Sequence, residues 1–303
     1  MGISKSLILG ILGCLSFRSS VRVSSVVTFQ WGHSTRAGCI GFIESFNAEN
    51  HKFYLGINLF TDLTNKEFKS TTANKGYKTS LERVPTGFMY ENVSFDALPT
   101  IVDWRPKVQS LPSRIRANVG IVKLKTGKLI SLSEQELVDC DVHGEDQGCE
   151  GGLMDDAFKF IIKNGGLTTE SNYPYTATYD KCKNGTNGVA TMKSYEDVPA
   201  NNEGALIQAV ASQPVSVAVE GGDMTFQFYK GRVMTGSCGT DLDHGIAAIG
   251  YGKTNDYTKY WLYLRTEKDI PDKRGMCGLR WSLLTPLHRR ASSSTYVRMH
   301  TIN

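Results

Sequence analysis

The sequence predicts an α+β fold with two sub-domains, because helical patterns come first along the chain and strand patterns come later. Apolar residues recur at helical spacing in several stretches between residues 40 and 210, whereas Val215, Val217 and Val219 alternate as in a strand. Residues 246–251 form an apolar, glycine-bounded run that indicates a second strand. The composition, 40% hydrophobic and 21% charged, is that of a globular protein.

The composition also excludes two classes of partner. No stretch of about eighteen apolar residues occurs, so we expect no membrane-spanning helix and no membrane partner. The chain has 34 Lys and Arg residues against 30 Asp and Glu residues, which leaves a net charge of +4. That excess is too small to indicate a nucleic-acid partner.

The N-terminus has the pattern of a secretory signal. Lys5 is followed by about ten mostly apolar residues, too few to span a bilayer. We expect a signal peptide over residues 1–25, with a buried first strand as the alternative. The protein then enters the secretory pathway, for an extracellular or a vacuole- or lysosome-like destination where disulfides persist. Asn92 and Asn184 begin acceptor sequences for N-glycosylation.

Two short helices are expected before residue 70. The apolar residues of segment 40–46 lie at near-helical spacing. Segment 63–68 can form the second helix, with Asp62 or Thr64 as its N-cap. Residues 70–97 are mostly polar, which is typical of a linker.

Helical patterns return further along the chain. Ser131 and Ser133 each begin a capping box, so either can start a short helix that runs through Leu137. Another helix is expected over residues 153–161, and the pair 165–166, both glycine, can end it in a left-handed turn.

The second half of the chain contains one further helix and the two strands. The helix is expected around residues 206–210, with Asn201 or Asn202 near its N-terminus. Pro214 separates it from the strand pattern that follows. Residues 280–303 show no clear period, and we expect them to form a poorly ordered tail.

Several ordered motifs together resemble the mature domain of papain-like cysteine endopeptidases, and plant members in particular. These motifs are Asp103-Trp-Arg105, Ser131-Leu-Ser-Glu-Gln-Glu-Leu-Val-Asp-Cys140, Gln147-Gly-Cys-Glu-Gly-Gly152, Asp243-His-Gly245 and Ile249-Gly-Tyr-Gly252. Upstream, Gly56-x-Asn58-x-Phe60-x-Asp62 is similar to the pro-segment motif of the same family.

The resemblance implies a papain-like two-lobe fold, with a helical lobe and a β-barrel lobe, and synthesis as a zymogen. It places a truncated inhibitory pro-segment and linker at residues 26–97, a peptidase domain at 98–279 and a divergent tail at 280–303. It implies peptide or protein substrates, the chain's own pro-segment and cystatin-like inhibitors as partners. We expect a monomer that needs no cofactor and no metal.

His244 matches the catalytic histidine of the family, which takes a proton from a cysteine thiol and passes it to the leaving amine. The cysteine itself is missing, because no Cys occurs between Cys39 and Cys140. A first gap after Asp103-Trp-Arg105 removes it, together with the oxyanion Gln. A second gap after Tyr260-Trp-Leu262 removes the Asn that orients the histidine. Ser110 and Ser113 lack the helical support that a substitute nucleophile needs.

Part of the substrate cleft is retained. By resemblance, Gly151 and Gly152 pair with the substrate backbone. Four further residues fall where the family lines its main specificity pocket: Met154, Ala218, Leu242 and Gly245. The alternative is that all six are ordinary core or turn residues.

The resemblance also implies two disulfides, Cys140 with Cys182 and Cys238 with Cys277. Cys149 resembles a family cysteine whose partner lies in the first gap, so we expect Cys149 to be unpaired.

Three functions therefore remain open. The chain can be an active endopeptidase, a non-catalytic protein that binds peptides or inhibitors, or the product of a degenerate or incorrectly assembled protease gene. The missing nucleophile favours a papain-like peptidase by descent that is inactive as written.

Overall fold

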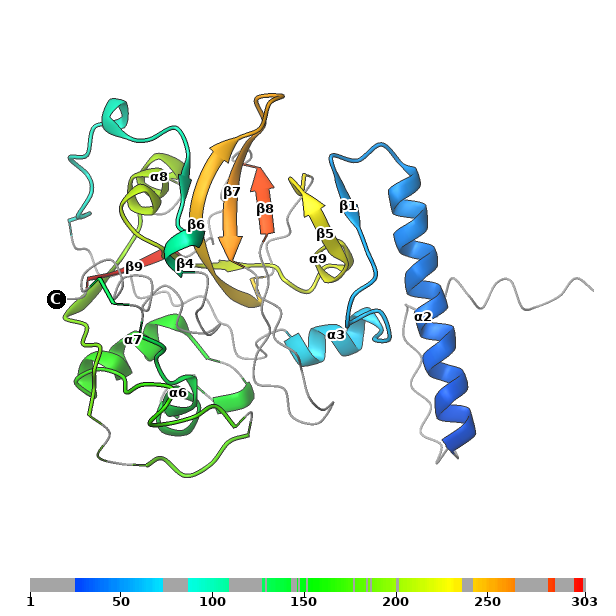
Figure 1. Ribbon diagram of the computed structural model, residues 1–303, viewed down its shortest axis with the longest axis horizontal. Coiled ribbons are helices and arrows are strands. Elements are labelled where there is room, and N and C mark those ends of the chain that lie inside the picture. The colour runs from blue at the N-terminus through cyan, green and yellow to red at the C-terminus, as the bar shows by residue number, and fades with distance from the viewer. Residues whose placement is uncertain are drawn as a thin grey trace, which may run out of the picture. The chain divides into compact units, whose positions relative to one another are not determined.

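The computed structural model of the chain divides into two compact units (Figure 1). The first unit comprises Met1–Ala73 and Gly221–Ser237, and the second comprises Asn74–Glu220 and Cys238–Asn303. The structure describes residues 25–72, 87–108, 127–128, 130–142, 146, 148–150, 152–176, 178–183, 185, 187–199, 202–235, 242–264, 283–286 and 297–301. Residues 1–24 of the expected signal peptide lie outside this set.

The first unit joins segments that are far apart in the sequence. Its described elements are α2 (Ser25–Ala48), β1 (Phe53–Leu55), α3 (Asn65–Thr72), α9 (Met224–Gln227) and β5 (Tyr229–Arg232). Strands β1 and β5 pair antiparallel, with Phe53 opposite Arg232. The helix expected over residues 40–46 is confirmed, and it starts much earlier, because a helix can extend through residues of adequate propensity without an apolar stripe.

Aromatic side chains form much of the core of the first unit. Phe46 and Phe53 have ring centroids 5.0 Å apart, and Phe60 and Phe68 meet edge to face at 5.1 Å. Phe53, Phe60 and Phe68 are all buried. These contacts pack α2 against β1 and α3 against the turn that follows β1, because aromatic pairs bury large areas in specific geometries.

Thr64, rather than Asp62, caps α3. The Thr64 hydroxyl accepts a hydrogen bond from the Glu67 backbone amide at 3.2 Å, and the Glu67 carboxylate accepts one from the Thr64 amide at 2.8 Å. This reciprocal pair is a capping box. Asp62 instead forms an ion pair of 2.8 Å with Arg36 of α2.

The described helices of the second unit are η1 (Phe95–Ala97), α4 (Arg105–Val108), α6 (Glu134–Cys140), η2 (Gly148–Glu150), α7 (Met154–Lys163) and α8 (Glu203–Ser212). Three of these helices, α6, α7 and α8, lie where the sequence predicts them, whereas η1, α4 and η2 were not predicted. Ser133 is the N-cap of α6, and Asn202 is the N-cap of α8; each accepts a bond from a backbone amide in the first turn. Gly165 and Gly166, with φ of 74° and 120°, follow α7 as expected.

The described strands of the second unit form one antiparallel sheet. In spatial order they are β3 (Ser194–Asp197), β9 (Val297–Thr301), β4 (Val215–Val219), β6 (His244–Lys253), β7 (Lys259–Leu264) and β8 (Leu283–Pro286), with β2 (Val102–Asp103) also on β6. Figure 1 shows β6, β7 and β8 side by side. Both strands that the sequence predicts, β4 and β6, are confirmed and pair with each other.

The expectation of a poorly ordered tail over residues 280–303 is wrong for its two strands. Strand β8 pairs with β7, and β9 pairs with both β3 and β4. Strands pair through backbone N–H and C=O groups, which every residue other than proline carries. A segment can therefore join a sheet although its side chains show no alternating pattern in the sequence.

Each face of the sheet carries a hydrophobic cluster. Ile249 and Leu262 belong to the cluster that includes Phe158 and Ile161 of α7. Ala248 and Trp261 belong to the cluster that includes Val215, Val217 and the buried residues of α8. Successive residues of a strand point to opposite faces, so β6 and β7 contribute to both clusters.

Gly250 of β6 is the position where the sheet tolerates no side chain. A Cβ there would lie 2.1 Å from the backbone oxygen of Val102 in β2. We predict that Gly250→Ala lowers the free energy of unfolding by about 3 kcal/mol, because the overlap is with backbone that cannot rotate away. Urea denaturation measures the change.

The matched control is Gly41→Ala. Gly41 lies on the exposed side of α2, and nothing lies within 4 Å of an added Cβ. Alanine should stabilise this helix by about 0.5–1 kcal/mol. If both variants had the same free energy of unfolding, the Val102 backbone of β2 would not lie in contact with Gly250 of β6.

Candidate functional site

His244 is the first residue of β6, and its position is set by pairing with β4. It lies opposite Val219, and the backbone amide of Asp243 donates to the Val219 oxygen at 3.1 Å. The His244 side chain is half-buried. The pairing of β6 with β4 therefore fixes the backbone of the predicted catalytic histidine at the partly exposed start of β6.

Three of the predicted pocket residues gather beside His244. Gly245 lies opposite Ala218 in the β4–β6 register. Met154, the first residue of α7, places its sulfur 3.6 Å and its Cγ 3.7 Å from where a Gly245 Cβ would be. Leu242 precedes the strand and is half-buried. The structure thus brings Met154, Ala218 and Gly245 together, as their predicted common role requires.

The glycine pair lies just before α7. Gly151 is outside the described residues, and Gly152 is half-buried. A Cβ at Gly152 would lie 1.8 Å from a carboxylate oxygen of Asp146, so only glycine fits there. Sequence reasoning missed Asp146, since nothing in its neighbourhood along the chain distinguishes it from a surface aspartate.

The structure describes only part of the chain on either side of the two expected gaps. Residues 109–126 and 265–280 lie outside the described residues, together with Ser110 and Ser113. In the described part, Trp104 donates from its indole nitrogen to the Val210 oxygen at 2.8 Å. Its backbone amide donates to the Ile249 oxygen of β6 at 2.8 Å, so Trp104, just before the expected first gap, is held by both α8 and the sheet.

The cysteines correct one prediction and confirm another. Cys140 and Cys182 form the expected disulfide, with a Cα–Cα distance of 4.7 Å. Cys149, expected to be unpaired, is disulfide-bonded. The prediction assigned its partner from the order of residues in the family, whereas thiols bond wherever the fold brings them within reach. The expected partners Cys238 and Cys277 lie outside the described residues, and so does Asn184.

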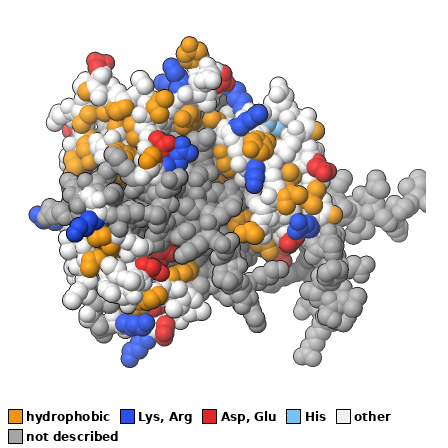
Figure 2. Space-filling view, in the orientation of Figure 1, with side chains coloured by type: hydrophobic (Ala, Val, Ile, Leu, Met, Phe, Trp, Pro, Cys, Tyr) orange, Lys and Arg blue, Asp and Glu red, His pale blue; other side chains and the backbone are white. Residues whose placement is uncertain are grey.

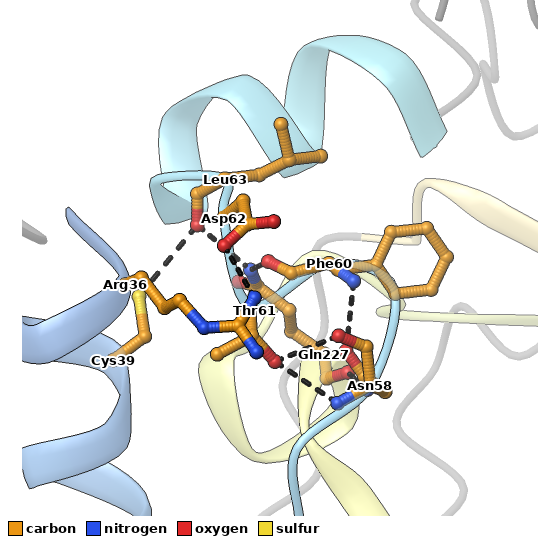
Figure 3. A network of polar contacts seen from close by, with 8 residues as sticks. All are labelled: Arg36, Cys39, Asn58, Phe60, Thr61, Asp62, Leu63 and Gln227. Carbon is orange, nitrogen blue, oxygen red and sulfur yellow. Dashed lines mark hydrogen bonds and ion pairs between the residues drawn. The ribbon is translucent and has the colours of Figure 1, made fainter. Parts of the chain in front are cut away.

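The motif of residues 56–62, which resembles a pro-segment motif, contacts Gln227 of α9 (Figure 3). The Gln227 side-chain nitrogen donates to the oxygens of Phe60 and Leu63 at 3.1 and 3.2 Å. Asn58 donates from its side chain to the Gln227 backbone oxygen at 2.7 Å. Gln227 is completely buried. It therefore gives two backbone oxygens of the turn after β1 a further buried donor, in addition to the Leu63 amide on Phe60 and the Cys39 thiol on Leu63.

Two neighbours extend this network. Asn65 donates to the Gln227 side-chain oxygen at 3.1 Å and to the Gly222 backbone oxygen at 2.9 Å. The buried Cys39 thiol of α2 donates to the Leu63 oxygen at 3.7 Å. The motif of residues 56–62 therefore has a structural role here, since Asn58 and Phe60 bind the segment that contains Gln227. Sequence reasoning found the motif and missed Gln227.

On the face drawn in Figure 2, the described residues show no single dominant charge. Figure 2 shows Lys and Arg interspersed with Asp and Glu on the visible face. Within the same residues, no helix is both long and apolar enough to cross a membrane. No group of three or more His, Cys, Asp or Glu side chains in that part of the chain could hold a metal ion.

Comparison with known proteins gives matches over most of the chain. Residues 112–265 match the family model described as papain family cysteine protease. The senescence-specific cysteine protease SAG39 of Oryza sativa subsp. indica is 59% identical over 330 aligned positions, which cover 92% of this chain and 97% of the relative. SAG12 of Arabidopsis thaliana is 48% identical over 75% of this chain and 74% of its own.

Solved structures of proforms are also similar. A recombinant stem bromelain precursor has 32% sequence identity and a TM-score of 0.76, covering 93% of this chain and 95% of its own. The proform of the ragweed pollen allergen Amb a 11 has 28% identity and a TM-score of 0.76, covering 90% of this chain and 88% of its own.

Proposed function

The chain belongs to the papain family of cysteine proteases and has the fold of its proforms, and we propose that it is a secreted, plant-type member that no longer cleaves peptides. One observation carries the proposal: His244 is present, but the sequence has no cysteine between Cys39 and Cys140. A thiolate is the nucleophile of this chemistry, and a histidine without it cannot start the reaction.

The comparison with SAG39 supports the loss of whole segments. The aligned region runs over 330 positions, which exceeds the 303 residues of the entire chain. The relative therefore carries residues that this chain lacks. This agrees with two gaps, one after Arg105 and one after Leu262, that remove the nucleophile, the oxyanion Gln and the orienting Asn.

Binding without catalysis is the second candidate function. The gathering of Met154 and Ala218 around Gly245 favours it, because this part of a peptide-binding pocket does not depend on the missing nucleophile. Peptides, the pro-segment and cystatin-like inhibitors are the proposed occupants. A transcript that encodes the missing motifs would instead support an incorrectly assembled gene.

Maturation is proposed to follow the family pattern. Residues 1–25 are the signal peptide, residues 26–97 the pro-segment and linker, residues 98–279 the peptidase domain and residues 280–303 the tail. The Cys140–Cys182 disulfide supports passage through an oxidising compartment. Asn92 is exposed and in a turn, which suits it as a glycan acceptor, and Asn184 is the second candidate.

We predict that the full chain hydrolyses no fluorogenic peptide substrate above background, with reductant present and across acid to neutral pH. A thiol-directed active-site titrant should label no residue in a His244-dependent manner. His244→Ala is the control and should be indistinguishable from the parent. Thiol-dependent cleavage that His244→Ala abolishes would overturn the proposal.

Binding of a cystatin to the inactive chain, measured by calorimetry, would support the second candidate function. If no cystatin bound, cystatins would be excluded as partners.

A further inference from the structure

Two buried aspartates face each other next to the predicted peptide-binding glycine. Asp141, the C-cap residue of α6, is 6% exposed, and Asp146 is 8% exposed. Their side chains are hydrogen-bonded to each other. Neither residue belongs to the catalytic machinery that the family resemblance implies.

A hydrogen bond between two carboxyl groups requires a proton. Two carboxylates are both acceptors, so one of the pair must be protonated to donate. Burial and like charge both oppose a second ionisation, as in other carboxyl pairs that share a site. The pKa of Asp146 is accordingly raised from 3.8 to about 9, first by burial and then by Asp141.

Asp146 also holds the backbone that leads into α7. One of its carboxyl oxygens accepts a hydrogen bond of 2.6 Å from the Leu153 amide. The same oxygen would lie 1.8 Å from a Cβ at Gly152. The Asp146 carboxyl therefore lies directly against the backbone of Gly152 and Leu153.

The position of this backbone matters for the pocket. Leu153 is the N-cap residue of α7, and leucine has no side-chain acceptor with which to bond the first turn. Met154 follows immediately and lies against Gly245, beside His244. A shift of Leu153 would move Met154 as well, because consecutive residues of a helix start move together.

We propose that Asp146 is a positioning residue for the peptide-binding surface, which holds Gly152 and the start of α7 through a proton shared with Asp141. The link to peptide binding rests on the proposed function. The link to the backbone of Gly152 and Leu153 stands without it.

This arrangement makes the start of α7 sensitive to pH. Among the described residues, Asp141 from the end of α6 and Asp156 from the first turn of α7 are charged groups that act on Asp146. The folded-state pKa lies above the unfolded value, so the pair stabilises the fold fully below about pH 4, and this stabilisation declines as the pH rises toward about 9. At high pH the second ionisation breaks the shared hydrogen bond.

Amide hydrogen exchange on the full chain tests the proposal. Exchange rates of residues 152–163, corrected for the intrinsic pH dependence, should rise about tenfold or more in the parent between pH 5 and pH 9. Asp146→Asn retains an acceptor for the Leu153 amide and adds a permanent donor to Asp141, so its protection should be high and independent of pH. Asp146→Ala should lose the protection at every pH.

Asp156→Asn is the matched control, since it removes a facing charge but leaves the shared proton, and it should keep the pH dependence. Protection in the parent that does not change with pH would overturn the proposal. So would an Asp146→Asn variant that exchanges as fast as Asp146→Ala. The exchange measurement needs neither cleavage nor a bound peptide. Peptidase activity in the chain would therefore contradict the proposed function without changing the exchange rates that test Asp146.

Discussion

Replacing Cys140 and Cys182 together by serine is expected to lower the free energy of unfolding of the second unit by about 4 kcal/mol. The disulfide joins residues 42 positions apart, and closing a loop of that length removes this much conformational entropy from the unfolded chain. Net stabilities of domains are only about 5–15 kcal/mol, so the loss would be a large share. Urea denaturation of the oxidised proteins measures it.

Hydrogen bonds beside this disulfide should hold the fold when the disulfide is removed. Asp139, adjacent to Cys140, is buried and accepts hydrogen bonds from the Tyr173 hydroxyl at 2.8 Å and from Gln135 at 2.7 Å. Burial, and then Asp139, raises the pKa of Tyr173 to about 12. Because this network holds the α6 side of the loop without the disulfide, the variant should still fold.

The reduced parent should be less stable than the variant, since reduction also opens the disulfide of Cys149. A loss below about 1 kcal/mol would show that the unfolded chain is already compact.

Gln227→Met is expected to cost about 2–4 kcal/mol in the first unit. The change keeps the volume but removes the donor to the Phe60 and Leu63 oxygens and the acceptor for Asn65. The Phe60 oxygen keeps its bond from the Leu63 amide, and the Leu63 oxygen keeps the Cys39 thiol as a donor. The loss is therefore that of three hydrogen bonds, at about 0.5–1.5 kcal/mol each, and partial exposure of Leu63 and Asn65 reduces their share. Hydrogen exchange over residues 53–72, together with urea denaturation, reports the loss.

Gln213→Met is the matched control for the same substitution. Gln213 is 5% exposed, and its side-chain nitrogen has no hydrogen-bond partner among the described residues. Methionine should therefore be neutral or stabilising there, by up to about 1 kcal/mol. If both variants lose the same stability, the hydrogen bonds of Gln227 contribute nothing beyond its packing.

Local features of the fold were predictable from the sequence. Thr64, Ser133 and Asn202 cap helices because a side-chain oxygen next to the first turn bonds nearby amides, and this interaction needs only residues three positions away. Strand β4 was predictable for the same reason, since alternation is a local pattern. For Thr64 and Asp62 the sequence left both caps open, and the ion pair of Asp62 with Arg36 distinguishes them.

The candidate site was predictable only in part. His244 and Gly245 were found because the motif around them resembles a family, and the structure places Met154 and Ala218 beside Gly245. Asp146 was missed because its role comes from the approach of Gly152 and Asp141, which no pattern of neighbouring residues signals.

Sequence alone predicted the family, the missing nucleophile and the positions of most of the described helices, because each prediction depends on residue identity in order along the chain. Other features depend on contacts between segments far apart in that order. They include the bonding of Cys149, the pairing of β8 and β9 with the sheet, the binding of the pro-segment motif by Gln227 and the proton shared by Asp141 and Asp146. Hydrogen bonds, disulfides and pKa values respond to whichever groups packing brings within a few ångströms, so these features follow from the folded structure.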